Sequence, residues 1–229
     1  MNSKINKLFG ISTRTRYVLT GMLIASLCMS TGCQALLATV LIAFGAHETK
    51  AKYKFFKGKK VAVACVSETL HDLRYDDVPR DLAKAVGMHL EQNVKKIEIV
   101  SPSKVNTWLV RHENRIEDPQ KFAKDMEADF VMIIELASFQ TSALSSPGSY
   151  QGRASTSFVV YDAKGKLQAA EALPEFVYPP NGRLSAGDTR ESEFKKGYLV
   201  ELSRMISCYF YSYNHRDNYA MDAKAGLSF

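Results

Sequence analysis

One stretch of the chain gathers side chains that could transfer protons or hold a metal ion. The sequence HDLRYDD places His71, Asp72, Asp76 and Asp77 close together. A histidine beside carboxylates is a combination used in general acid–base catalysis. The stretch follows the first predicted strand, and ligands often bind at the carboxyl ends of parallel strands. A hydrolase site is therefore one hypothesis for this stretch, and a solvated loop is the simpler interpretation.

The other residues whose side chains could take part in catalysis or metal binding form no known catalytic or metal-binding pattern. The remaining histidines are His47, His89, His112 and His215. None of them has zinc spacing such as H-E-x-x-H, and there is no C-x-x-C pair, nucleophile elbow or phosphate-binding glycine loop. His89 falls on the apolar stripe of a predicted helix, which indicates a hydrogen-bonded histidine at the core boundary. The sequence predicts no metal, no cofactor and no enzymatic activity.

Two cysteines lie in the body of the chain. Cys65 sits in an apolar strand without a neighbouring base, which argues against a nucleophilic role. Cys65 and Cys208 could form a disulfide in an oxidising compartment, or both could be buried free thiols. The sequence leaves both alternatives open.

A further cysteine, Cys33, follows an export leader. Residues 1–16 are basic and contain no acid, and residues 17–32 carry no charge. A positive head followed by an apolar run and small residues is typical of a signal peptide. The Ser-Thr-Gly before Cys33 resembles a bacterial lipobox, although Ser30 stands where leucine is usual. This resemblance implies cleavage after Gly32 and attachment of a lipid to the thiol of Cys33.

The apolar segment after Cys33 supports an alternative anchor. Residues 35–46 are also uncharged, so residues 17–46 form one long apolar run. As a helix this run would be about 45 Å long, enough to cross a hydrocarbon core of about 30 Å with tilt. The alternatives are thus a single amino-terminal transmembrane anchor, or a short apolar helix that lies in the interface or docks on the body. Each places the body outside the cytoplasm, in the cell envelope.

The charge balance argues against a nucleic-acid partner. The chain has a net charge of +6, but Lys4, Lys7, Arg14 and Arg16 precede Cys33 and no acid does. Without these four, 26 basic residues face 24 acidic ones, a net charge of +2. The basic surplus therefore belongs mainly to the leader. An apolar content of 46% and a charged content of 24% are typical of a folded globular protein.

We divide the chain into four segments. Residues 1–32 are the predicted lipoprotein signal peptide, and residues 33–58 are a lipid-anchored apolar segment and linker. Residues 59–211 form one α/β envelope domain, because no repeat or long Pro/Gly/Ser stretch interrupts them. Residues 212–229 form a carboxy-terminal tail.

Apolar periodicity predicts the elements of this domain. Residues 60–68 are apolar on both faces, which indicates a central strand covered on both sides. A helix follows at 80–95, then a short strand at 96–100. Ser101 and Asp118 are predicted N-caps, each before a proline that opens a helix.

The second half of the domain is richer in strands. Three strands are predicted at 128–139, 152–162 and 167–176, before a closing helix at 190–211. The order β-α-β-α-α-β-β-β-α predicts an α/β (α+β) fold with a single mixed sheet of about five strands and helices packed on it. The loop YPPN, from Tyr178 to Asn181, is either a partner-binding loop or a rigid cap on the sheet edge.

The motifs KVAVACVSE, KKIEIVSPSKVNTWL, FAKDMEADFVMIIEL and TSFVVYDAKGKLQAAEA occur in an order that resembles a family of envelope lipoproteins. That family includes the curli-secretion lipoprotein, the lipoprotein activator of penicillin-binding proteins and the amino-terminal domain of TolB. The likeness covers roughly residues 59–210, and the rest resembles uncharacterised bacterial lipoproteins. It implies a non-enzymatic factor that binds another envelope protein or assembles into a homo-oligomer.

Overall fold

The computed structural model describes residues 48–67, 73–142, 148–180, 182, 184–185, 187 and 190–214. The chain separates into two compact units, and the second begins at Thr49. Cys33 and the predicted signal peptide lie outside the described residues, as do His71, Asp72 and Asn181. The following description concerns the second unit.

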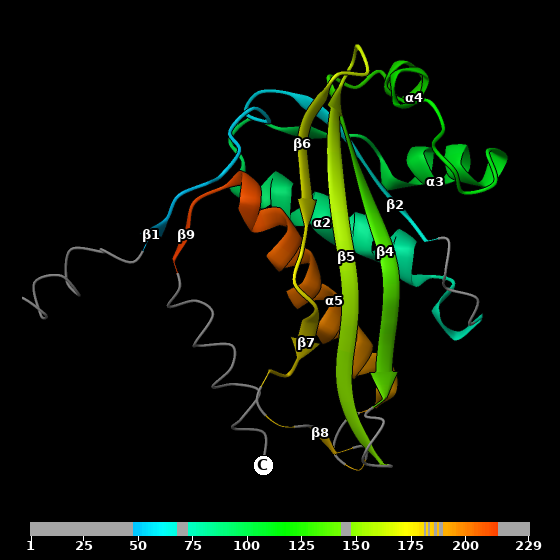
Figure 1. Cartoon of the computed structure of the whole chain (residues 1–229), viewed down its shortest axis with the longest axis vertical. Helices are drawn as coiled ribbons and strands as arrows, with labels where there is room; N and C mark the ends of the chain where they lie inside the picture. Colours follow the sequence, from blue (N-terminus) through cyan, green and yellow to red (C-terminus); the bar gives the residue numbers. More distant parts are fainter. Residues whose placement is uncertain are drawn as a thin grey trace, which may run out of the picture. The chain divides into compact units, whose positions relative to one another are not determined.

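A mixed sheet forms the centre of this unit (Figure 1). Its main path runs in the order β3 (Glu98–Ile99), β2 (Lys60–Val66), β4 (Phe130–Ser142), β5 (Ser149–Asp162) and β6 (Leu167–Ala172). Strand β2 is parallel to β3 and β4, whereas β4, β5 and β6 are antiparallel. Two short strands, β7 (Phe176–Tyr178) and β8 (Leu184–Ser185), also pair with β5. The predicted mixed-sheet α/β fold is therefore confirmed.

Helices pack on both faces of the sheet. In the part of the chain that the structure describes, the α-helices are α2 (Val78–Asn93), α3 (Pro102–Arg111), α4 (Pro119–Met126) and α5 (Glu191–Ser207). Helices α2 and α5 contribute to the larger hydrophobic core on one face, and α3 and α4 contribute to a smaller core on the other. A 3-10 turn, η2 (Leu73–Tyr75), precedes α2, and another, η3 (Cys208–Phe210), follows α5.

Strand β2 is covered on both sides, as its sequence predicts. Val61, Val63 and Cys65 lie in the larger core. Ala62 and Ala64 lie in the smaller core, where their small side chains let the helices approach. Alternate residues of a strand face opposite sides of the sheet. An apolar run without alternation therefore requires other elements to pack on both faces of the strand.

Two predicted elements end earlier than expected. The predicted strand 167–176 is broken, because β6 ends at Ala172 and β7 begins at Phe176. Pro174 lies between them and has no N–H to donate to a ladder. The last α-helix ends at Ser207 and continues as the 3-10 turn η3.

The two predicted N-caps behave differently. The Asp118 carboxylate accepts the backbone N–H groups of Gln120 at 2.9 Å and Lys121 at 3.1 Å. Ser101 occupies the predicted N-cap position before Pro102, but its side chain makes no capping hydrogen bond. There the Ser101 carbonyl accepts the N–H groups of Lys104 and Val105, and Pro102 has no N–H to satisfy.

This difference gives a testable prediction for helix stability. We expect Asp118→Ala to lower the free energy of unfolding by about 1 kcal/mol, because two N–H groups lose their acceptor. Ser101→Ala is the matched control and should change it by only a few tenths of a kcal/mol, roughly. Urea unfolding midpoints of the two variants would measure this, and equal losses would contradict the capping difference.

Part of the predicted linker packs against the domain. Phe56 is fully buried, and its ring stacks on Phe210 with centroids 4.4 Å apart. The Tyr53 N–H donates to the Tyr209 carbonyl at 2.9 Å. Nearby, β1 (Glu48–Thr49) pairs with β9 (Tyr213–Asn214) in a separate two-stranded sheet. The aromatic residues of this lysine-rich segment thus join the core.

Candidate functional site

Strand β5 is apolar on both faces near its carboxyl end. Phe158 and Val160 point into the larger core and are buried. Val159 and Tyr161 must face the opposite side of the sheet. They are half-buried and belong to neither hydrophobic core of the described residues.

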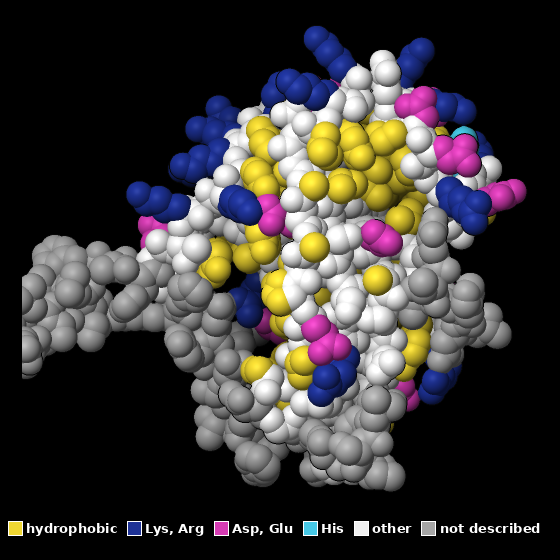
Figure 2. Space-filling view, in the orientation of Figure 1, with side chains coloured by type: hydrophobic (Ala, Val, Ile, Leu, Met, Phe, Trp, Pro, Cys, Tyr) yellow, Lys and Arg dark blue, Asp and Glu magenta, His cyan; other side chains and the backbone are white. Residues whose placement is uncertain are grey.

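The strand register extends this apolar surface across three strands. Val159 is paired with Ile133 of β4 on one side and with Ala170 of β6 on the other. Tyr161 is paired with Leu167, whose side chain is 51% exposed. We name these five residues the open sheet face. Figure 2 shows apolar side chains gathered in the upper part of the sheet face that looks toward the viewer.

The open sheet face has clear limits. On the β2 side it ends at Ile133, which packs against the smaller core beneath α3 and α4. Farther along the strands the same face becomes polar, where the Ser157 hydroxyl donates to the Glu135 carboxylate at 3.2 Å. Beyond that pair, Arg153 forms an ion pair with Glu175 at 3.2 Å. The apolar surface is therefore local and lies near the β5–β6 turn.

Sequence reasoning did not identify this surface. The available signal was the run Phe-Val-Val-Tyr at 158–161, which lacks the alternation expected of an antiparallel strand with one face in water. The structure places this part of the sheet outside both hydrophobic cores of the described residues, although α4 approaches the end of β5.

The predicted hydrolase stretch borders a cavity of about 170 Å³. The cavity lies at the carboxyl end of β2, between α2 and α3, and Asp76, Arg80 and Asn106 are among its lining residues. Asp76 is exposed. Because His71 and Asp72 are outside the described residues, the convergence of all four side chains stays a prediction.

The second described carboxylate of that stretch is already engaged. The Lys195 ammonium of α5 donates to Asp77 at 2.6 Å, and this contact lowers the pKa of the Asp77 carboxyl. Asp77 is not among the residues that line the cavity, so the structure assigns Asp76 and Asp77 to different surroundings. Within the described ranges, no group of three or more His, Cys, Asp or Glu side chains could hold a metal ion.

Both cysteines of the body are free thiols. Cys65 is buried in β2, and this burial raises the pKa of its thiol. The Cys208 thiol donates to the Met205 carbonyl at 3.0 Å, and its pKa is also raised by burial. The sequence left open a disulfide between Cys65 and Cys208 or two free thiols, and the structure shows two free thiols. Thiols held in the protonated form are poor nucleophiles.

His89 and the described part of the YPPN loop contribute to the packing of the domain. His89 is half-buried on α2 and hydrogen-bonds the Val200 carbonyl of α5, and burial lowers the pKa of its imidazole. This confirms a hydrogen-bonded histidine at the core boundary. Tyr178 is paired with Gly152 at the sheet edge, and Pro179 is buried. The described part of the loop thus covers the edge of the sheet.

Comparison with known proteins leaves the family open. No protein-family model matches the chain, and no curated protein sequence matches it. Several solved structures are similar in fold. Lipoprotein GNA1162 from Neisseria meningitidis is 11% identical, with a TM-score of 0.40 over 64% of this chain and 96% of that one.

Two further structures show the same level of similarity. The PelC dodecamer from Paraburkholderia phytofirmans is 11% identical, with a TM-score of 0.41 over 67% of this chain and 91% of that one. The hypothetical protein CT253 from Chlamydia trachomatis is 13% identical, with a TM-score of 0.44 over 67% of this chain and 97% of that one. At these TM-scores the matches support no inference about function or assembly.

The resemblance to the curli-secretion, penicillin-binding-protein activator and TolB group stays a prediction. Among the helices that the structure describes, none is both long and apolar enough to cross a bilayer. The two anchoring hypotheses, a lipid on Cys33 and a transmembrane helix over 17–46, both fall on residues outside this description.

Proposed function

We propose that this protein is an extracytoplasmic lipoprotein, anchored to a membrane through a lipid on Cys33, that acts as a non-enzymatic binding or assembly factor in the cell envelope. The basic and then apolar leader before Cys33 supports the anchor. The open sheet face supports the binding role.

The observation that carries the binding role is the uncovered apolar side of β5. Antiparallel sheets with one face in water normally alternate apolar and polar residues. Here the part of this face that lies outside the smaller core carries Val159, Tyr161 and the half-exposed Leu167. Contiguous apolar patches on a protein surface mark interaction sites. A partner that covers this patch would supply the second layer that the strand composition requires.

The composition of the open sheet face indicates the chemistry of the partner. Its five side chains are aliphatic or aromatic and carry no charge. We therefore assign the open sheet face to a different envelope protein that presents an apolar strip.

Site-specific photocrosslinking in cells that produce the full-length protein tests this proposal. A photoreactive residue at position 159 should give an adduct with a second protein. The matched control is position 200, where Val200 is 44% exposed on α5 outside the open sheet face. Tyr161→Glu should abolish the adduct. The crosslinked peptide of the partner should be apolar.

Other outcomes would contradict the proposal in distinct ways. An adduct of two copies of this chain would assign the face to a homo-oligomer. Equal adducts from positions 159 and 200, or none from 159, would remove the binding role, provided that the variants retain the wild-type melting temperature. Mass spectrometry of the mature amino terminus, with Cys33→Ser as control, tests the anchor separately. An intact, unacylated Met1 terminus would contradict the lipoprotein assignment.

A further inference from the structure

The end of the domain through which the chain enters is strongly basic. Residues 50–60 contain six lysines and no acid. Lys95 and Lys96 follow α2 in the turn that leads to β3, and Lys164 and Lys166 lie in the β5–β6 turn. Three loops that are distant in sequence thus contribute lysines.

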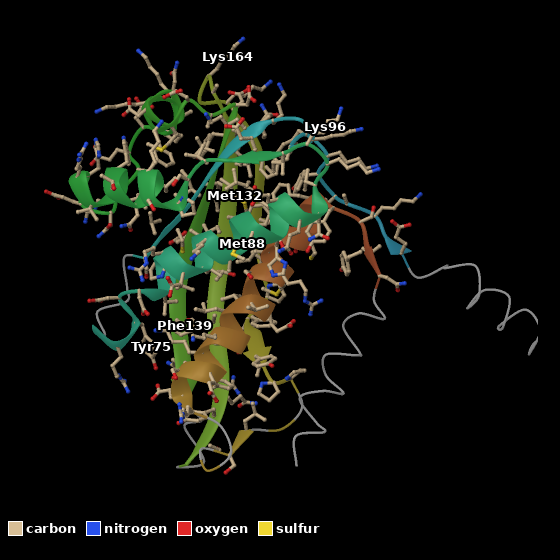
Figure 3. All side chains as sticks on the ribbon, turned by 180° about the vertical axis from the view of Figure 1, so that it is seen from behind. Tyr75, Met88, Lys96, Met132, Phe139 and Lys164 are labelled. Atoms are coloured by element: carbon tan, nitrogen blue, oxygen red, sulfur yellow. The ribbon has the colours of Figure 1, made fainter. Side chains whose placement is uncertain are left out.

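Backbone hydrogen bonds hold these loops at one end of the sheet. The Gly58 N–H donates to the Lys95 carbonyl at 3.2 Å. The Asp129 N–H donates to the Lys60 carbonyl at 2.8 Å, and the Asp129 carbonyl accepts the Ala163 N–H at 2.9 Å. Figure 3 shows Lys96 and Lys164 at the same end of the molecule. The tertiary structure therefore fixes this concentration of charge.

The acids at this end already have partners. The Asp162 carboxylate accepts the backbone N–H groups of Lys164 and Lys166, and Glu171 accepts from Lys52 and Tyr53. Lys60 pairs with Glu98 at 3.2 Å, and Lys59 lies 3.9 Å from Asp129.

Within residues 52–60 and the two turns, six other lysines are exposed and form no ion pair with any described residue. We name them the basic end: Lys54, Lys57, Lys95, Lys96, Lys164 and Lys166.

We propose that the basic end binds the anionic surface of the bilayer to which the chain is anchored, an inference that rests on the proposed anchoring. Glu48 follows Cys33 by 15 positions, so an extended connection reaches about 50 Å at most. The connection therefore keeps the lysines at the start of the domain within reach of the membrane surface. Tethering raises the effective concentration of the membrane surface around the basic end.

The charge arrangement suits a bilayer surface. Each lysine near an anionic leaflet strengthens binding by roughly fivefold, and the attraction decays within a Debye length of about 10 Å at 0.1 M salt. Stable attachment often combines an acyl chain with a polybasic patch. Lysines from three loops fixed at one end of a sheet can meet a flat anionic surface together.

Lysine acetylation rates, resolved by mass spectrometry, test this inference on the full-length chain. The chain is placed in nanodiscs of phosphatidylcholine, with or without phosphatidylglycerol. The internal controls are Lys84 on α2 and Lys196 on α5, which are both exposed. We expect phosphatidylglycerol to slow acetylation of the basic end by roughly tenfold and to leave both controls unchanged. The protection should vanish at about 1 M salt, where the Debye length is about 3 Å.

Two charge-reversal variants distinguish the effect of charge at the basic end from the effect of the net charge of the protein. Lys96→Glu with Lys164→Glu should reduce the protection of Lys54 and Lys57 to below roughly twofold. The matched double variant, Lys84→Glu with Lys196→Glu, should retain it. Equal wild-type rates in the two lipids, or equal losses in both variants, would overturn the inference. Retention on a heparin resin without protection in nanodiscs would point to a soluble polyanion and would also overturn it.

The test distinguishes this inference from the proposed anchor. The apolar residues 17–46 allow insertion into nanodiscs whether or not Cys33 is acylated. Protection of the basic end in an unacylated chain would support the inference and contradict the lipoprotein assignment. Acylation of Cys33 without protection of the basic end would support the lipoprotein assignment and contradict the inference.

Discussion

Replacing Gly152 with alanine should destabilise the protein by about 3 kcal/mol, because the new methyl group would collide with a locked aromatic ring. A Cβ atom at Gly152 would lie 2.6 Å from Cε1 of Tyr198 and 2.7 Å from its Cδ1 and Cζ atoms. Tyr198 is fully buried, so its ring has no solvent to move into.

The neighbours of Tyr198 explain why the collision cannot be relieved cheaply. The ring stacks on Phe139 with centroids 5.0 Å apart and on Phe176 at 5.7 Å. Tyr178 and Phe194 stack on it at 6.1 Å each. In a close-packed interior these rings must move together, or β5 must shift away from α5.

Thermal unfolding of the full-length protein measures this effect. A loss of about 3 kcal/mol corresponds to a melting temperature about 6–12 °C lower for a domain of this size. Gly197→Ala is the matched control, because its Cβ would lie 3.9 Å from the Tyr178 hydroxyl, an ordinary contact. That change inside α5 should stabilise the protein by about 0.5–1 kcal/mol. A Gly152→Ala protein as stable as wild type would contradict the packing of α5 on β5.

Phe56→Ala should cost about 4 kcal/mol, the loss expected when a fully buried phenylalanine is truncated. The Phe56 ring contacts Phe210 at 4.4 Å, Phe55 at 5.0 Å and Phe130 at 5.7 Å between centroids. Truncation would remove the ring that joins the entering chain to the start of β4 and to η3.

The control for Phe56 is its exposed neighbour. Lys57→Ala removes a long side chain from the same loop without opening a cavity, so its effect should stay within about 0.5 kcal/mol. Urea unfolding of both variants would measure the difference. If Phe56→Ala changes the free energy of unfolding by less than about 1 kcal/mol, residues 49–58 behave as a linker, as the lysine-rich sequence suggested.

The elements that sequence predicted best depend on residues close together in the chain. The helix α4 begins at Pro119 as expected, because Asp118 caps it through neighbouring N–H groups. Strand β2 shows the predicted burial on both faces, because its apolar run leaves no polar side. At Ser101 the predicted N-cap position is also confirmed, although the side chain makes no capping hydrogen bond.

The candidate sites depend on contacts across the fold. Asp77 looked like one member of an acidic loop, but Lys195, far along the chain, pairs with it. In the sequence the six lysines of the basic end belong to three separate loops, and only the tertiary structure joins these loops through hydrogen bonds. Neither contact has a signature in the local sequence.

The amino-acid sequence by itself predicted the longer strands and helices of the domain and established the basic and then apolar composition of residues 1–32. These follow from hydrophobic periodicity, capping and charge within a few residues. Tertiary structure alone decided which side of β5 stays uncovered and which lysines stand together. Strand order and helix placement decide both features. They depend on packing between segments that are far apart in the sequence.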